Sequence, residues 1–180
     1  MRKKLIIATI FIISIAFGWF AYTNLYPAQN LRRYSVYYAH NIEHKKGAHP
    51  EMAMALENIK VIHTPASKGI RYDYDGLAKV YNDRNNGNSH SIFATYVCGV
   101  EYLYSNSKNR SYIFNSDFSL KAIYNSNAAK MEYEKSDIDE EELYKEVYNN
   151  FGFLVEANVN RKPLINMQKE FNKKYYKRFN

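Results

Sequence analysis

The chain has 180 residues, a net charge of +7 and one cysteine, Cys98. A lone cysteine cannot form an internal disulfide, so the composition excludes the class of small secreted domains that depend on disulfide pairs. The length suits one domain of the common ~100–150 residues together with a short additional segment. The sequence has no low-complexity tract and no internal repeat, which excludes a string of modules.

The N-terminus carries an uninterrupted apolar run, residues 5–22, directly after three basic residues. The basic residues are Arg2, Lys3 and Lys4. The run is close to the ~20 residues that an α-helix needs to cross the hydrocarbon core of a membrane. Because cytoplasmic flanks are rich in Lys and Arg, we expect residues 1–4 to stay in the cytoplasm and residues 23–180 to be exported. The sequence therefore predicts a signal-anchor helix that crosses the inner or cytoplasmic membrane once, followed by a periplasmic or extracellular domain.

A cleaved secretory signal is the alternative interpretation of the same run. Ala16-Phe17-Gly18 is a passable small-x-small cleavage site after a basic start and an apolar stretch. Trp19 and Tyr22, however, continue the run past that site and would form an aromatic belt at the outer interface. Both interpretations export the rest of the chain, and cleavage of residues 1–18 stays open at this level.

Two helices are expected at the start of the exported part. Residues 27–46 repeat apolar and aromatic side chains at helical spacing, and Gly47 fits the end of that helix. A second, shorter helix is expected to begin at Pro50, because proline is favoured in a first helical turn. Residues 60–64 are then expected to be extended.

The middle of the chain has the alternating pattern and the turn residues of an antiparallel β-meander. Strands are expected at residues 70–74, 77–81, 91–104, 110–114, 118–124 and 130–134. Asp75-Gly76 separates the first two strands, and Asn86-Gly87 has the composition of a tight hairpin turn. Cys98 falls within the long strand and is expected to pack there as a small apolar residue.

Three further elements are expected after the meander. An acidic helix over residues 136–151 should begin at Ser136 and bury Leu143, Val147 and Phe151. A last strand over residues 153–159 and a basic amphipathic helix over residues 163–179 follow. The predicted fold class is therefore α+β, with an N-terminal transmembrane helix followed by one exported domain in which helices flank the antiparallel β-meander.

Opposite charges concentrate in the two predicted C-terminal helices. Residues 132–146 contain eight acidic residues and two lysines, whereas residues 161–180 contain seven basic residues and one glutamate. Such poles suit the capture of a charged partner, because electrostatic complementarity accelerates association. The candidate partner-binding residues are Glu140 and Glu141 in the acidic helix and Lys173 and Lys174 in the basic helix.

His40, Glu43 and His44 form an H-x-x-E-H string that resembles the zinc motif of the inverted-zincin metallopeptidases. On one helix, two histidines four residues apart share a face and can reach one Zn²⁺, with the glutamate beside them as a general base. The resemblance covers five residues, and the sequence marks no third ligand. We therefore expect no metal site and no cofactor, and a solvent-exposed pair of histidines is the preferred interpretation.

His44, His49, Met52 and Met54 can also be interpreted as soft copper ligands, but methionines at these spacings are usually part of a core. The sequence contains no G-x-S-x-G elbow, no G-x-x-x-x-G-K loop and no G-x-G-x-x-G turn, so no catalytic residue is expected.

These observations favour a membrane-anchored, exported protein that binds a protein partner and no nucleic acid. It would be either an immunity-type neutraliser of an envelope-acting toxin or an accessory subunit of an envelope assembly. The alternative from another class is a zinc-dependent envelope hydrolase that uses His40, Glu43 and His44.

Overall fold

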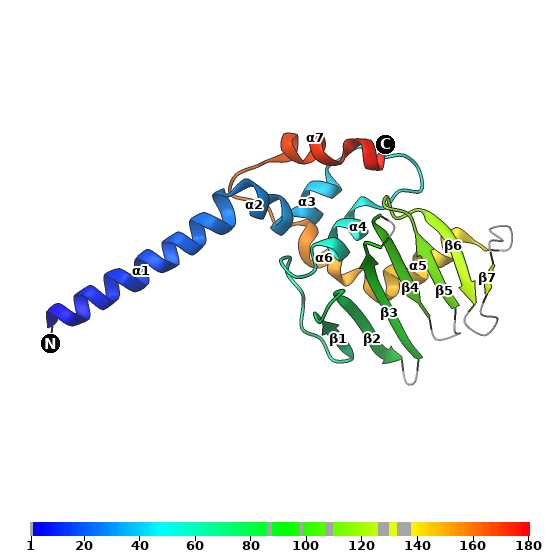
Figure 1. Ribbon diagram of the computed structural model, residues 1–180, viewed down its shortest axis with the longest axis horizontal. Coiled ribbons are helices and arrows are strands. Elements are labelled where there is room, and N and C mark those ends of the chain that lie inside the picture. The colour runs from blue at the N-terminus through cyan, green and yellow to red at the C-terminus, as the bar shows by residue number, and fades with distance from the viewer. Residues whose placement is uncertain (1, 86–87, 98, 107–109, 126–129, 133–137) are drawn as a thin grey trace.

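The computed structural model describes residues 2–85, 88–97, 99–106, 110–125, 130–132 and 138–180. Over these residues the chain is an α+β protein with seven helices and one antiparallel sheet, so the predicted class is confirmed (Figure 1). The predicted turn at Asn86-Gly87, the predicted helix start at Ser136 and the predicted packing of Cys98 lie outside the described residues.

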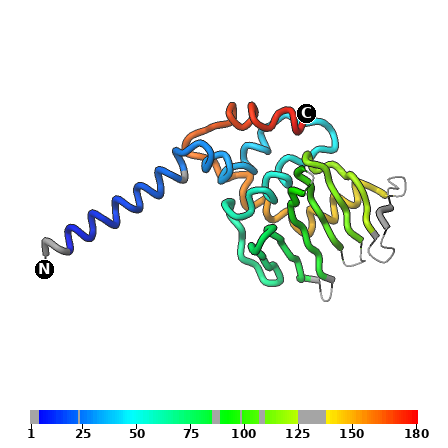
Figure 2. The backbone as a smooth tube through the Cα atoms, in the orientation of Figure 1, coloured from blue at the N-terminus to red at the C-terminus, as the bar shows by residue number. Residues whose placement is uncertain are grey.

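Helix α1, Arg2–Leu25, extends away from the rest of the molecule, and the trace in Figure 2 shows it standing clear of the other elements except at its C-terminal end. Its apolar window Leu5–Tyr22 is long enough to cross a membrane, and none of that window is buried inside the protein. A helix that is apolar on all sides needs an apolar environment, which here the protein itself does not supply. A signal sequence near the N-terminus would have the same properties.

Three short helices connect α1 to the sheet: α2 (Pro27–Arg33), α3 (Ser35–His40) and α4 (Pro50–Glu57). The helix predicted to begin at Pro50 is confirmed, but the single helix predicted over residues 27–46 is wrong. The helical structure in this segment is interrupted at Tyr34 and ends at His40. The physical reason is tertiary, because the Lys45 amide donates to the Phe179 carbonyl (2.9 Å) and so draws the chain toward the C-terminus.

Residues 60–62 continue as a turn rather than the expected extended segment, since the amides of Val61 and Ile62 both donate to the Asn58 carbonyl.

In the part of the chain that the structure describes, seven strands form a sheet in which every strand pairs with the next one along the chain, so the predicted meander is confirmed. The strands are β1 (Ile70–Asp73), β2 (Lys79–Asn85), β3 (Asn88–Thr95), β4 (Glu101–Ser105), β5 (Arg110–Phe114), β6 (Leu120–Asn125) and β7 (Lys130–Glu132). The long strand predicted over residues 91–104 is in fact two strands, because Thr95 pairs with Glu101 across a reversal of the chain. Gly99, at φ 102°, occupies a conformation that favours glycine. The two-residue alternation of apolar side chains in the sequence continues through this reversal, so the pattern predicted one long strand instead of two.

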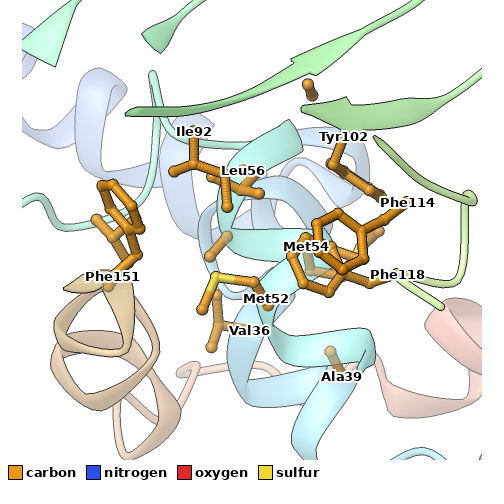
Figure 3. Packing of buried hydrophobic residues seen from close by; sticks show 14 of the residues in the cluster. Val36, Ala39, Met52, Met54, Leu56, Ile92, Tyr102, Phe114, Phe118 and Phe151 are labelled. Atoms are coloured by element: carbon orange, nitrogen blue, oxygen red, sulfur yellow. The ribbon is translucent and has the colours of Figure 1, made fainter. Parts of the chain in front are cut away.

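One face of the sheet carries the core. Val80, Ile92, Tyr104 and Tyr112 are in register across four adjacent strands, and all four are buried. Helix α4 lies against this face and is itself covered by α3, so Met52 and Met54 of α4 are completely buried (Figure 3). The core is thus a sheet, a buried apolar helix and an outer helix stacked in layers.

Three helices follow the sheet: α5 (Glu140–Phe151), α6 (Phe153–Val159) and α7 (Gln168–Phe179). Helix α5 buries the predicted stripe of Leu143, Val147 and Phe151, and Asp139 caps it by accepting from two backbone amides of the first turn. Helix α7 begins at Gln168, not at residue 163 as predicted.

The strand predicted over residues 153–159 is wrong, because this segment is helix α6. Gly152 adopts helical angles (φ −58°, ψ −23°), and its carbonyl accepts from the amides of Val155 and Glu156, so the helical path continues from α5 into α6. A Cβ atom at Gly152 would lie 2.5 Å from the Tyr148 carbonyl oxygen. A side chain at position 152 would therefore collide with the Tyr148 carbonyl, and glycine, which has no Cβ, avoids this collision.

Candidate functional site

The four predicted partner-binding residues lie on two helices with different neighbours. Glu140 and Glu141 are in the first turn of α5, next to the sheet, whereas Lys173 and Lys174 are in the middle of α7, which packs on α3 (Figure 1). Glu141 is exposed, and its Oε1 is 2.8 Å from the Nζ of Lys145. Lys173 and Lys174 are both exposed. The two pairs are therefore presented by separate elements.

The H-x-x-E-H string does not lie on one helix, which corrects the premise of the zinc interpretation. His40 is the last residue of α3, and Glu43 and His44 follow in an irregular segment. His40 Nδ1 is 3.1 Å from Glu51 Oε1, and His44 Nδ1 is 3.2 Å from the Ile42 carbonyl oxygen. Among the residues that the structure describes, no three His, Cys, Asp or Glu side chains gather so that they could hold a metal ion.

A polar depression of about 430 Å³ lies between α5 and strands β2 and β3. It is lined by Asn82, Arg84, His90, Glu142, Lys145, Glu146, Asn149 and Asn150. At its base the Nδ2 of Asn82 donates to the carbonyl oxygen (2.9 Å) and to the Oδ1 (3.2 Å) of Asn150, which ties α5 to the sheet. The mixture of cationic, anionic and amide groups suits a polar ligand rather than an apolar one.

A chain of hydrogen bonds connects His90, Tyr104 and Glu146 at this depression. The Tyr104 hydroxyl donates to Glu146 Oε1 (2.6 Å), and His90 Nδ1 lies 2.8 Å from the same hydroxyl oxygen. Burial, together with the hydrogen bond to Glu146, raises the pKa of Tyr104 well above its ordinary value, so the hydroxyl keeps its proton. Because that single proton is directed at Glu146, the geometry assigns a proton to His90 Nδ1, which donates to Tyr104.

This hydrogen-bond chain fixes the orientation of a buried imidazole beside a polar depression, which is an arrangement suited to recognising a hydrogen-bonding group. Sequence reasoning missed it because its three residues come from β3, β4 and α5. His90 and Tyr104 are 14 residues apart, and Tyr104 and Glu146 are 42 residues apart. No sequence pattern indicates that residues at such separations are in contact.

A second cluster joins α4, β4 and α7 through Glu57, Tyr102 and Arg178. The Arg178 guanidinium donates to both Glu57 and Tyr102, and its Nε donates to the Ser116 carbonyl (2.6 Å). The Glu57 and Arg178 side chains are only 13% and 15% exposed. Burial, beside the Glu57 carboxylate, raises the pKa of Tyr102 well above its ordinary value, so Tyr102 remains a neutral donor. Arg178 thereby fastens α7 to the rest of the core.

A smaller depression of about 160 Å³ borders this cluster, between α2, α4 and the β1–β2 connection. Glu57 lines it together with the cationic residues Arg32 and Lys60 and the ring of Tyr96. The Lys60 ammonium, however, donates to the carbonyls of Tyr74 (3.1 Å) and Gly76 (3.4 Å), which gives it a structural role in closing that connection.

The histidine and methionine residues of the copper interpretation do not converge. Met52 and Met54 are completely buried in the core, as expected of core methionines. His49 packs instead among aromatic rings, with centroid distances of 4.0 Å to Tyr144, 5.6 Å to Tyr148 and 6.2 Å to Phe118. Burial lowers the pKa of His49 below its ordinary value near 6.5, although the Glu51 carboxylate acts in the opposite direction.

Because His49 is partly shielded from water, we expect the protein to lose stability in mild acid. The folded state favours neutral His49, so as pH falls below about 6.5 the unfolded chain takes up a proton that the folded chain does not, and the free energy of unfolding decreases. We expect the melting temperature of the parent to fall between pH 7.5 and pH 5.5 by more than that of His49→Phe, which keeps an aromatic ring without the titration. Equal decreases in the two proteins would contradict this assignment.

Asp117, which lies nearby, titrates at lower pH than the range of that test, so it does not contribute to the change in melting temperature. Burial opposes ionisation of Asp117, but hydrogen bonds from Lys45 and Ser119 outweigh it and hold the pKa of Asp117 below its ordinary value of 3.8. Its contribution to stability is therefore present above pH 4 and is lost only as pH falls through the lowered pKa.

No family model matches this sequence, and neither the curated proteins nor the solved structures include a significantly similar chain. The class that the structure itself defines is an α+β protein with one N-terminal helix long and apolar enough to cross a membrane.

Proposed function

We propose that this protein is a single-pass membrane protein whose exported α+β domain works by binding another protein. Residues 1–4 stay in the cytoplasm, residues 5–22 cross the inner or cytoplasmic membrane, and residues 23–180 fold on the other side. The observation that carries the proposal is the basic face of α7, which points to solvent on a helix that is firmly held in place.

Two features support an uncleaved anchor. Helix α1 continues without interruption through the candidate cleavage site Ala16-Phe17-Gly18 as far as Leu25. The apolar run also continues past that site to Tyr22, which makes it longer than the ~7–15 residues typical of the apolar region of a cleaved signal. The three basic residues before the run support the inward orientation of the N-terminus.

The basic face of α7 supports partner binding through charge. The exposed lysines of this helix are Lys169, Lys173, Lys174 and Lys177. The opposite side of α7 is fixed, since Phe171 and Phe179 are completely buried and Arg178 is bonded to Glu57. Glu170 is also exposed on α7, so the helix is not of one charge sign, but its four exposed lysines leave the solvent-facing side with a net positive charge. A rigid element of net positive charge loses little conformational entropy on binding and attracts an acidic surface from a distance.

Two specific versions follow from this proposal. In the first, the domain is an immunity-type protein that neutralises a toxin acting in the envelope; in the second, it is an accessory subunit of an envelope assembly. Both need an exported, anchored binding domain of this size. The zinc-hydrolase alternative finds no support in the geometry, since α3 ends at His40 and His44 lies beyond it.

Reversing charge on α7 tests the proposal. Lys173→Glu with Lys174→Glu should change the free energy of unfolding by no more than ~0.5 kcal/mol, because both side chains are exposed. The same double substitution would place negative charges opposite an acidic partner surface and so weaken binding. We expect a partner crosslinked to the full-length protein in membranes of the producing cells to be recovered at least tenfold less with this variant, measured by quantitative mass spectrometry.

Lys46→Glu with Lys68→Glu is the matched control, because it changes the net charge equally at exposed positions outside α7. Glu140→Lys with Glu141→Lys tests the acidic pole in the same assay. This pair also places two cations at the positive end of α5 and removes the Glu141–Lys145 pair, so its stability must be measured in parallel. If both pole variants recover the same proteins as the parent and the control, the charge poles do not bind a partner.

A further inference from the structure

A second exposed apolar surface lies where α1 meets the rest of the molecule. The connection between α6 and α7 passes beside the α1–α2 junction (Figure 1). It exposes two apolar side chains, Leu164 (66%) and Ile165 (42%). Leu25 and Tyr26, at the end of α1, are 48% and 53% exposed. These four side chains bring apolar surface from two distant parts of the sequence to one end of the protein.

Buried hydrogen bonds hold this connection against the end of α1. Asn30 Nδ2 donates to the carbonyl of Asn24, in the last turn of α1, at 2.8 Å and to the carbonyl of Ile165 at 3.2 Å. The Tyr38 hydroxyl donates to Asn30 Oδ1 (2.7 Å) and accepts from the Met167 amide (3.1 Å). Asn30 and Tyr38 are completely buried. The apolar connection is therefore fixed at the level where α1 ends.

We propose that Leu164 and Ile165, together with Leu25 and Tyr26, form a second contact with the bilayer in which α1 is inserted. The apolar window of α1 ends at Tyr22, so side chains within the next turn lie in the interfacial layer between acyl chains and headgroups. Leu164 and Ile165 are held at that same level and enter the interfacial layer from the side. The lipid surface that covers them is the one that already surrounds α1.

Charge and aromatic composition fit a lipid surface at this place. Arg161 and Lys162 precede the apolar pair, separated from it only by Pro163, and basic residues close to apolar ones are attracted to anionic headgroups. Trp19 and Tyr22 of α1 and Tyr26, which follows α1, form a continuous aromatic group with ring centroids 6.3 Å and 5.5 Å apart. Such rings favour the membrane interface.

The second contact with the bilayer would restrict the orientation of the domain. A single helix leaves a domain free to tilt about its anchor, whereas two contacts on different parts of the chain fix the orientation of the domain. Helix α7 leads away from the α1–α2 junction, so its C-terminal end would be held at a distance from the bilayer (Figure 1).

Depth-dependent fluorescence quenching in vesicles tests this inference on the full-length chain. In a Cys98→Ser background, Leu164→Cys carries an environment-sensitive fluorophore, and the protein is reconstituted with lipids that bear nitroxide quenchers near the glycerol end of the acyl chain. We expect blue-shifted emission and at least twofold quenching at position 164. Tyr176→Cys, at an exposed position (47%) toward the C-terminal end of α7, is the matched control and should show water-like, unquenched emission.

Two further measurements make each outcome decisive. The inference takes from the proposed function only the insertion of α1, and quenching of Trp19, the single tryptophan, reports that insertion separately. Lys162→Cys repeats the measurement next to the apolar pair without removing an apolar side chain. Quenched Trp19 with water-like emission at both 162 and 164 would overturn the second contact, whereas unquenched Trp19 would overturn the anchor itself.

Discussion

Arg178→Met is expected to lower the free energy of unfolding of the domain by about 3–5 kcal/mol, because it leaves the Glu57 carboxylate in a mostly buried position without its cation. The same substitution removes the donor to the Ser116 carbonyl and releases the last turn of α7 from α4 and β4. Urea unfolding of the full-length protein in mild detergent, followed by circular dichroism, measures the loss.

A double variant separates the cost of an unpaired charge from the value of the ion pair. In Glu57→Leu with Arg178→Met neither charge remains, and the Tyr102 hydroxyl can still donate to the Ser116 carbonyl, 3.3 Å away. We therefore expect the double variant to be more stable than Arg178→Met alone. A double variant that loses the full sum of both single losses would show no coupling between Glu57 and Arg178 and would contradict the cost assigned to the orphaned charge.

Phe114→Ala is expected to cost about 3–5 kcal/mol, the range for truncating a fully buried aromatic side chain. The ring of Phe114 stacks on that of Phe118, with centroids 4.5 Å apart and planes 3° from parallel, and both rings lie beside Tyr102 and α4 (Figure 3). Tyr176→Ala is the control, since its side chain is exposed and should change stability by ~0.5 kcal/mol or less. The same urea titration compares the two.

Phe118 allows a sharper version of this test, because its backbone has φ 67°, where residues other than glycine are strained. The stacked ring holds Phe118 in that conformation. Phe118→Ala should therefore be destabilising by about 1 kcal/mol more than Phe118→Gly, although both remove the whole ring. The usual order, with alanine the more stable, would contradict the strain assigned to this turn.

Local patterns in the sequence predicted much of the fold correctly. The apolar run of residues 5–22, the helix that starts at Pro50, the meander from Ile70 onward and the buried stripe of α5 each depend on residues close together in the chain. Periodicity and turn chemistry carry such information directly. The charge poles were likewise visible in the composition of two short segments.

The candidate sites were not predictable in the same way. His90, Tyr104 and Glu146 meet only because β3 and β4 pair in one register and α5 covers that face. Glu57 and Arg178 are 121 residues apart and meet through the docking of α7. Nothing in the spacing of these residues distinguishes them from surface charges and ordinary core aromatics.

Local hydrophobic periodicity was enough to predict the apolar N-terminal helix, the order of most elements and the α+β class. The ends of the helices and the meetings of polar residues depended on tertiary contacts. The Phe179 carbonyl accepts a hydrogen bond from the Lys45 amide, so residues 41–46 do not continue the predicted helix. The Asn158 side chain, 95 residues from His63 in sequence, bonds to both the amide and the carbonyl of His63 and so fixes residues 153–159 as helix α6 rather than a strand. In both cases a contact between distant residues outweighs a local preference of a few tenths to about one kcal/mol per residue.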